Sequence, residues 1–339
     1  MSRIAVVLFN LGGPDSPAAV LPFLRNLFRD PAILRVPALV RPFLAELIAR
    51  GRAPVAREIY GRIGGRSPIL PQTEAQARAL ERSLADAGEV RAFIAMRYWH
   101  PRARETAAAV RAFAPTQIVL LPLYPQFSTT TTESSFDEWH RVYGHNANTV
   151  AIGCYPREDW FVRAYAACIA PVLADARRHG TPRVLFSAHG LPQKIADAGD
   201  PYTRHVEQSV AAIARALGLS EGTWVTTYQS RVGRLEWVKP STEDEVKRAG
   251  ADRVPLVLAP ISFVSEHSET LVELDIELRE TAQHAGVPAY FRAPTVSAAD
   301  TFIAGLADLV RTALRGELRG CPLHADHKCP RPACAMEAA

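Results

Sequence analysis

The sequence has neither a long hydrophobic run nor a cluster of like charges. Within its 339 residues, no apolar stretch reaches the roughly 18 to 20 residues that cross a bilayer. The net charge of +4 is spread along the chain, without the run of Lys or Arg that is typical of a nucleic-acid-binding arm. The start, MSRIAVVLFNLGGPDS, lacks the charged region and the small-residue cleavage site of a signal peptide. We therefore expect a cytoplasmic protein that does not bind nucleic acid.

Phosphate-binding motifs are also missing. Two glycine-rich segments occur, NLGGPDS at residues 10–16 and RIGGRSPI at 62–69. Neither has the G-x-x-x-x-G-K-[ST] spacing of a phosphate-binding loop or the three glycines of a dinucleotide-binding turn. Tight turns explain both segments better than nucleotide binding does.

Cysteine is scarce and unevenly distributed. Of the five cysteines, three lie in the last 19 residues, which is unlike the framework of a secreted, disulfide-bonded domain. Their crowding indicates a metal site or an iron–sulfur cluster. An all-cysteine site needs Cys154 or Cys168 as a fourth ligand, and a zinc site that uses His324 or His327 is the alternative. The three thiols of the tail are Cys321, Cys329 and Cys334.

The chain does contain a regular alternation of apolar strands and amphipathic helices. It is 48% hydrophobic and 22% charged, which is enough apolar material for a large core. Apolar runs bounded by turn residues predict seven or eight strands, at 3–10, 90–98, 117–125, 149–156, 183–189, 224–230 and 253–264. Helical patterns lie between them, at 73–88, 104–114, 160–180 and 201–218. This order predicts an α/β fold whose parallel sheets are covered on both faces.

A weak internal repeat indicates two similar halves. Segments 118–135 and 257–271 both run from an apolar strand through a proline to a helix start rich in Ser, Thr and Glu. We expect two Rossmann-like, doubly wound parallel-sheet domains, at 1–160 and 161–312, with a ligand cleft between them and a cysteine-bearing tail at 313–339. Ligands of such sheets bind beyond the carboxyl ends of the strands.

Residues 32–55, AILRVPALVRPFLAELIARGRAPV, do not fit a plain α/β unit. The segment is apolar with interspersed Arg and Pro, and it is longer than an ordinary connection. It predicts either a buried helix pair or an apolar lip that contacts a membrane surface or an apolar ligand.

A row of carboxylates and one histidine are the strongest candidates for chemistry. Glu269, Glu273 and Glu277 lie four residues apart, a spacing at which like charges destabilise a helix by roughly 0.2 to 0.5 kcal/mol per pair. The row is either a solvated acidic face or a set of ligands for a divalent cation. His189 ends the strand RVLFSAH, where it is placed to act as a base or, alternatively, to cap a turn.

Taken in order, the motifs of the chain resemble those of the ferrochelatases, which insert ferrous iron into a porphyrin late in haem synthesis. The motifs are NLGGPDS, RIGGRSPI, MRYWHP, LPLYPQFSTTTTESS, FSAHGLP, GDPY, TYQSRVG and PISFVSEHSETLVELDIE, and they cover nearly the whole chain. The resemblance implies two Rossmann-like domains with a porphyrin cleft between them. It also implies a lyase that inserts Fe2+ into protoporphyrin IX to form protohaem, without an organic cofactor. A cobalt or nickel chelatase and a porphyrin carrier without turnover are the rival functions.

The resemblance assigns site residues as well. The family's histidine and glutamate at the porphyrin centre fall on His189 and Glu269, and Glu273 and Glu277 continue along a metal or proton path. Which of His189 and Glu269 accepts protons and which binds the metal stays open. The resemblance implies that four residues contact the substrate: Leu34, Arg97, Tyr98 and Trp237. Tyr124 and His267 are added as substrate contacts because they lie at the ends of predicted strands.

The tail departs from the family pattern. Members that hold a [2Fe–2S] cluster use a C-terminal C-x2-C-x4-C and one distant cysteine, whereas here the gap of four is kept and the first gap is seven. The resemblance implies a [2Fe–2S] cluster, with zinc as the alternative, on Cys168, Cys321, Cys329 and Cys334. Residues 32–55 match the family's apolar lip, so we expect peripheral contact with the inner face of the membrane. The lip and the tail favour protoporphyrin over coproporphyrin, and the tail is compatible with a homodimer.

Overall fold

The computed structural model describes residues 2–230 and 235–318. Contacts within it divide the chain into two compact units, of which the second is Tyr155–Gly305. The first unit runs up to Cys154 and resumes at Leu306. The boundary expected from the sequence, between 160 and 161, falls inside helix α6 (Asp159–Arg177), and helix α11 (Asp300–Leu314) begins in the second unit and ends in the first.

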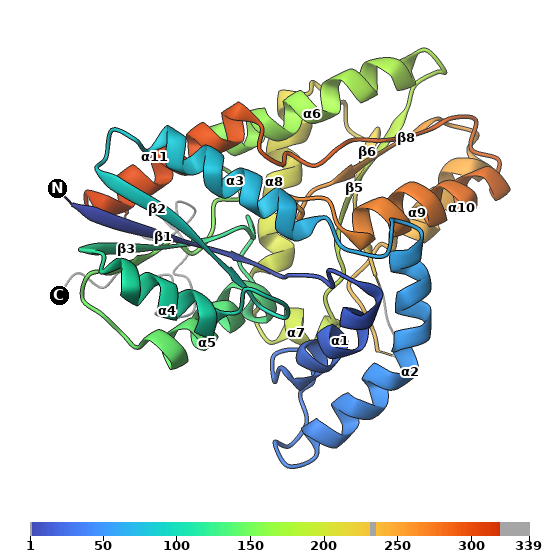
Figure 1. Cartoon of the computed structure of the whole chain (residues 1–339). Coiled ribbons are helices and arrows are strands. Elements are labelled where there is room, and N and C mark those ends of the chain that lie inside the picture. The colour runs from blue at the N-terminus through green and yellow to red at the C-terminus, as the bar shows by residue number, and fades with distance from the viewer. Residues whose placement is uncertain (1, 231–234, 319–339) are drawn as a thin grey trace. The chain divides into compact units, whose positions relative to one another are not determined.

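The first unit is built on a four-stranded sheet in which every pairing is parallel. Its order is β2-β1-β3-β4, with bounds Glu89–Met96, Arg3–Asn10, Gln117–Pro122 and Thr149–Ala151. Alternate residues of β1 (Ala5, Val7 and Phe9) pack against helices α4 (Ala103–Phe113) and α5 (Ser134–Tyr143). Helix α3 (Ile69–Ser83) lies on the opposite face (Figure 1). Because β1 is covered on both sides, its apolar run is continuous.

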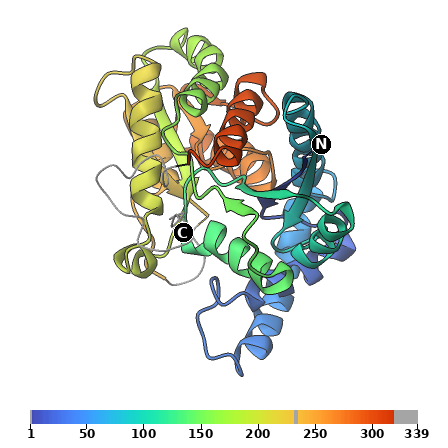
Figure 2. The same ribbon diagram turned by 90° about the vertical axis from the view of Figure 1, so that its left-hand side faces the viewer.

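The second unit repeats this plan. Its strands follow the order β6-β5-β7-β8, all parallel, with bounds Trp224–Gln229, Arg183–His189, Leu256–Pro260 and Tyr290–Arg292. Leu185, Leu256 and Leu258 pack against helices α9 (Thr242–Ala251) and α10 (Leu278–His284). Helices α6 and α8 (Tyr202–Ala216) pack against each other beside the same sheet (Figures 1 and 2). The α/β fold with parallel sheets is therefore confirmed.

The internal repeat extends to an unusual helix type. In each unit the third strand ends in a proline, Pro122 or Pro260, and leads to a π-helix. These are η2 (Thr129–Glu133) and η3 (Glu269–Glu277), which continue directly into α5 and α10. A π-helix forms i→i+5 hydrogen bonds, is rare, and occurs frequently at functional sites. The candidate carboxylates lie in the longer of the two.

Residues 32–55 form a turn-rich stretch followed by most of helix α2 (Arg41–Gly61). Small residues such as Ala49 and Ala53 pack toward α1 (Val20–Arg29), and α2 projects from the sheet of its own unit (Figures 1 and 2). Large apolar residues point outward instead, with exposures of 88%, 79% and 71% for Leu39, Phe43 and Leu47. The alternative of a buried helix pair is therefore wrong. Among the described residues, no helix is long and apolar enough to span a membrane.

Candidate active site

His189 is the last residue of β5, at the carboxyl end of the second sheet. Gly190 donates its N–H to Gln229 O at 2.8 Å, and Tyr202 Oη donates to His189 O at 3.1 Å. These two bonds hold the peptide group that follows His189. The side chain itself keeps 44% of its surface exposed, so the ring is accessible to a ligand.

The π-helix η3 presents two carboxylates to this region. Glu269, its first residue, lies 2.8 Å from His189 Nδ1 through Oε2. Glu273 accepts a hydrogen bond from Ser230 N at 2.7 Å and a second from Ser230 Oγ. Ser230 directly follows β6, which pairs with β5. Strand ends β5 and β6 and the helix after β7 therefore supply the site together.

Glu269 and His189 form a mutually stabilised pair. Burial raises the pKa of Glu269, but the charge and hydrogen bond of His189, with smaller effects of His267 and Ser230, lower it to about 2. Burial lowers the pKa of His189, but Glu269, and more weakly Glu273, raise it above its ordinary value. The carboxylate thus favours the protonated imidazole. Because Nδ1 faces Glu269, Nε2 is the nitrogen left to exchange a proton with a ligand.

Glu273 behaves differently from Glu269. Burial and the negative charge of Glu269 raise its pKa to about 7, although the hydrogen bonds from Ser230 and the charge of His189 oppose this shift. Glu273 therefore takes up and releases a proton near neutral pH. Since only one of the two carboxylates is firmly ionised, their repulsion in the row is reduced. Their hydrogen bonds also exclude the alternative of a simply solvated acidic face.

His267 lies just before η3 and is buried, with 6% of its surface exposed. Its Nε2 is 3.8 Å from Glu269 Oε2, and its Nδ1 has no hydrogen-bond partner among the described residues. Burial lowers the pKa of His267, and the opposing effects of Glu269 and Glu266 do not reverse this. A neutral imidazole is thus available beside the His189–Glu269 pair.

Glu277 ends η3, is half-buried, and has no ion-pair partner within the described part of the chain. In residues 2–230 and 235–318, no group of three or more His, Cys, Asp or Glu side chains is arranged to hold a metal ion. One imidazole and one carboxylate remain as the first donors that a cation would meet at His189 and Glu269.

Arg97 and Tyr98 lie in the first unit, inside a buried polar network. Arg97 pairs with Asp30 Oδ2 at 2.7 Å and with Glu138 Oε2 at 3.0 Å. Tyr98 Oη donates to Asp30 Oδ2 at 2.7 Å, and Ser134 Oγ donates to the same atom at 2.6 Å. Tyr98 is 0% exposed and Arg97 9%. In contrast to the expected substrate contact, Tyr98 has no free surface, and both side chains support Asp30 and the loop that follows it.

The other expected substrate residues are divided between the units. Leu34 and Tyr124 are half-buried in the first unit, where Tyr124 packs on the core under α4 and α5. Trp237 is half-buried in the second unit and forms an antiparallel bridge with Pro192, shortly after His189. Trp237 is therefore the member of this set that lies in the same unit as His189, and it pairs with a residue three positions after that histidine.

Two cysteines lie within the described residues. Cys154 is buried, and Cys168 is half-buried on α6. Burial and the negative charge of Glu266 raise the pKa of the Cys168 thiol. The other three cysteines, Cys321, Cys329 and Cys334, lie outside the described residues.

Ser230 and Tyr202 were not among the site residues predicted from the sequence. Both lie in recognisable motifs, TYQS and GDPY, and Ser230 is the first residue after a strand that neighbours that of His189. A polar residue at the carboxyl end of an adjacent parallel strand is a usable signal. Tyr202 carries no such signal, because it reaches His189 O from the start of helix α8.

Two units, each built on a parallel α/β sheet, with an imidazole–carboxylate pair at the end of one sheet, give the chain a two-domain, chelatase-like fold. The fold is similar to that of SirB from Bacillus subtilis, solved with Fe3+, at a TM-score of 0.53 and 12% identity, over 94% of this chain and 98% of that chain.

The comparison of sequences is more specific. The ferrochelatase family model matches residues 3–314. Curated ferrochelatases are similar to the chain: that of Phenylobacterium zucineum is 55% identical over 92% of this chain and 92% of its own length. Those of Caulobacter vibrioides and of a Wolbachia of Drosophila simulans are 53% and 50% identical, over 91% and 90% of this chain and 90% and 98% of their own. The chain belongs to the ferrochelatase family, and the resemblance seen in its motifs is confirmed.

Proposed function

We propose that this protein inserts ferrous iron into protoporphyrin IX to form protohaem, with His189, Glu269 and Glu273 as the reacting groups. The observation that carries the proposal is the 2.8 Å contact between His189 Nδ1 and Glu269 Oε2 at the head of a π-helix whose next carboxylate, Glu273, has a pKa of about 7. Membership of the ferrochelatase family supports the choice of iron and porphyrin.

The chemistry requires two protons to leave the pyrrole nitrogens as the metal enters. His189 accepts a proton at Nε2, and Glu269 stabilises the imidazolium that results, since its charge already raises the pKa of His189. Glu273 then provides a group that binds a proton near neutral pH. Glu269 remains ionised and attracts the incoming cation, and Glu277 extends the row of carboxylates along η3.

Substrate contacts by Leu34, Trp237 and His267 belong to the same proposal. His267 supplies a buried, neutral imidazole beside Glu269, and Trp237 an apolar ring in the unit of His189. An apolar surface holds a largely hydrophobic macrocycle while it is distorted for metal entry. The network around Arg97 and Tyr98 shapes the chain at Asp30, four residues before Leu34. Tyr124 is proposed to line the substrate site as well.

A direct assay tests the function. Anaerobically purified protein is mixed with ferrous iron and protoporphyrin, and the change from free-base to metalloporphyrin absorption is followed. We expect turnover that His189→Ala abolishes, whereas His284→Ala, which alters an exposed histidine of the same unit, leaves it intact. Coproporphyrin is assayed in parallel. Binding of both porphyrins by the intact protein without metal insertion would contradict the proposal and favour a carrier.

Exposed apolar residues on α2 and just before it support peripheral contact of a cytoplasmic protein with a membrane. Leu39, Phe43 and Leu47 recur every four residues and are largely exposed, and Arg50 and Arg52 lie just beyond them. Apolar side chains flanked by cations bind anionic lipid surfaces. Cosedimentation with anionic and with neutral vesicles tests this contact, and a failure to bind either kind would contradict it.

A [2Fe–2S] cluster on Cys168 and the three tail cysteines is the expected resident cofactor. Four thiolates are the donor set of such a cluster, and Cys168 offers a half-buried thiol for it. The cluster has no step in metal insertion. Electron paramagnetic resonance of the reduced protein, together with metal analysis for zinc, distinguishes a [2Fe–2S] cluster from a zinc ion. Cys168→Ser should remove the signal of the cluster.

Sedimentation of the intact protein tests the expected homodimer.

A further inference from the structure

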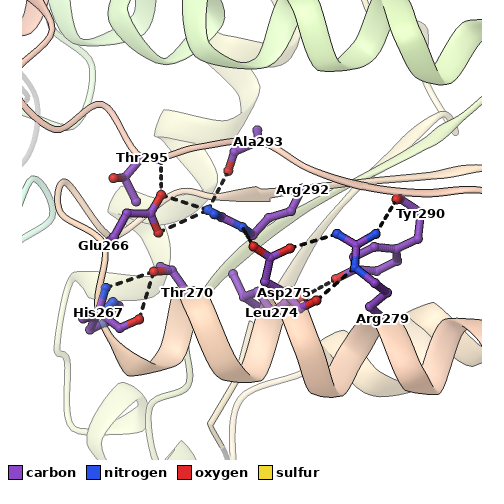
Figure 3. A network of polar contacts seen from close by, with 10 residues as sticks. All are labelled: Glu266, His267, Thr270, Leu274, Asp275, Arg279, Tyr290, Arg292, Ala293 and Thr295. Carbon is purple, nitrogen blue, oxygen red and sulfur yellow. Dashed lines mark hydrogen bonds and ion pairs between the residues drawn. The ribbon is translucent and has the colours of Figure 1, made fainter. Parts of the chain in front are cut away.

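A second polar cluster, which the proposed reaction does not use, joins η3 and the residues just before it to strand β8 (Figure 3). Its centre is Arg292, the last residue of β8, with a side chain that is 11% exposed. Arg292 Nη1 lies 2.9 and 3.2 Å from the carboxylate oxygens of Glu266, and its Nε lies 3.1 Å from Asp275 Oδ2. One guanidinium therefore joins two carboxylates that flank Glu269 in the sequence.

Other contacts fasten the same stretch to β8. Tyr290 lies two residues before Arg292, on the same face of the strand, and its hydroxyl donates to Leu274 O. Arg279 of α10 pairs with Asp275 Oδ1 at 2.8 Å and donates to Tyr290 O at 3.0 Å. Figure 3 shows these groups as one continuous network.

This arrangement matters because η3 is a π-helix. Such helices are rare and rarely exceed one turn, so their hydrogen-bond register needs support from outside. The network holds η3 at Leu274 and Asp275 and holds the segment just before it at Glu266, and the carboxylates of Glu269 and Glu273 lie between these points along the chain. A shift of the register by one residue would turn both away from His189 and Ser230.

We propose that Arg292 is a positioning residue for metal insertion: by binding Glu266 and Asp275 at once, it holds η3 in the register that directs Glu269 to His189 and Glu273 to Ser230. The inference rests on the proposed function for its kinetic part. Arginine suits this role because its planar fork reaches two carboxylates, whereas a lysine ammonium is a single point charge.

The test compares Arg292→Met and Arg292→Lys with Arg183→Met. Arg183 is a matched control, since it is 15% exposed, pairs with Asp252 at 2.7 Å, and lies at the amino end of β5, at the other end of the strand from His189. We expect Arg292→Met to raise KM for iron about 10- to 100-fold, as losses of supporting contacts at metal sites do. Arg292→Lys should show a smaller rise, and KM for porphyrin should stay unchanged in both.

A variant that is only partly folded has a lower apparent kcat but an unchanged KM for iron. Loss of folded protein can therefore be distinguished from loss of positioning by Arg292. Hydrogen–deuterium exchange of peptides from 262–280 gives a readout independent of activity, and exchange there should be faster in the Arg292 variants than in Arg183→Met. An unchanged KM for iron and unchanged exchange in Arg292→Met, or equal changes in Arg183→Met, would overturn the inference. If Arg292→Met does not fold, wild-type values in Arg292→Lys would overturn it. If the wild type inserts no iron, the proposed function fails, and the exchange data still decide whether Arg292 holds η3.

Discussion

Glu273→Gln should stabilise the protein while lowering its activity. The pKa of Glu273 is about 7 in the folded protein, against 4.5 for an ordinary glutamate. Between these values the folded state holds a proton that the unfolded state has lost, so stability falls as pH rises through this window. At about 1.4 kcal/mol per pKa unit, a difference of about 2.5 corresponds to about 3 kcal/mol of destabilisation above pH 7. Glu273 is half-buried, and screening by solvent leads us to expect about 1 to 3 kcal/mol.

Glutamine is neutral at every pH, which gives the effect a distinct signature. Chemical denaturation of the metal-free protein should show no gain for the variant at about pH 4, a growing gain up to about pH 7, and a constant gain above about pH 8. Iron insertion should fall, because the proton exchanged by Glu273 is lost. Glu280→Gln, which removes an exposed carboxylate from the adjoining helix α10, serves as the control. A difference in unfolding free energy between variant and wild type that does not vary with pH would refute the reasoning. So would the absence of a difference at pH 8.

Three further predictions concern the His189–Glu269 pair, a close helix approach and the exposed face of α2. Glu269→Gln should lower the pKa of His189, because burial then acts without its main opposing charge; an unchanged value in an NMR titration would contradict the pair. Gly250→Ala should destabilise the second unit by about 1 to 3 kcal/mol, because a Cβ there would overlap the backbone oxygen of Ala285. A thermal midpoint equal to that of the wild type would count against this close approach. Phe43→Ser should leave stability unchanged, since that ring is 79% exposed, but should weaken binding to anionic vesicles; equal binding would exclude Phe43 from the contact.

Local patterns were sufficient for most of the regular structure. The apolar run at 183–189 is strand β5, and the pattern at 201–218 is helix α8, which spans Tyr202–Ala216. Strand ends were less accurate: β7 stops at Pro260, although apolar residues continue beyond it. Strand β8 was not located, because three residues are too short to show a period, yet it supplies Arg292 and Tyr290.

The expected site was only partly accessible to sequence reasoning. His189 and Glu269 are 80 residues apart, and the resemblance to a family named both. The periodicity of residues 269–277 fits an ordinary helix equally well, so it does not predict the π-helix found there. The resemblance was less informative for Tyr98. It implies a substrate contact for this residue, whereas in the structure its side chain is buried and donates a hydrogen bond to Asp30.

Sequence alone is enough to predict the alternation of strands and helices, the internal repeat and the available chemical groups, because these depend on local periodicity and residue type. Tertiary structure decided how those groups behave. The pKa of Glu269 falls to about 2 and that of Glu273 rises to about 7, although both are glutamates four residues apart on one helix. The difference arises because His189, at the end of β5, keeps Glu269 ionised, whereas burial and the charge of Glu269 raise the pKa of Glu273 despite its hydrogen bonds from Ser230. Only the parallel pairing of β5 and β6 brings His189 and Ser230 to the same edge of the sheet.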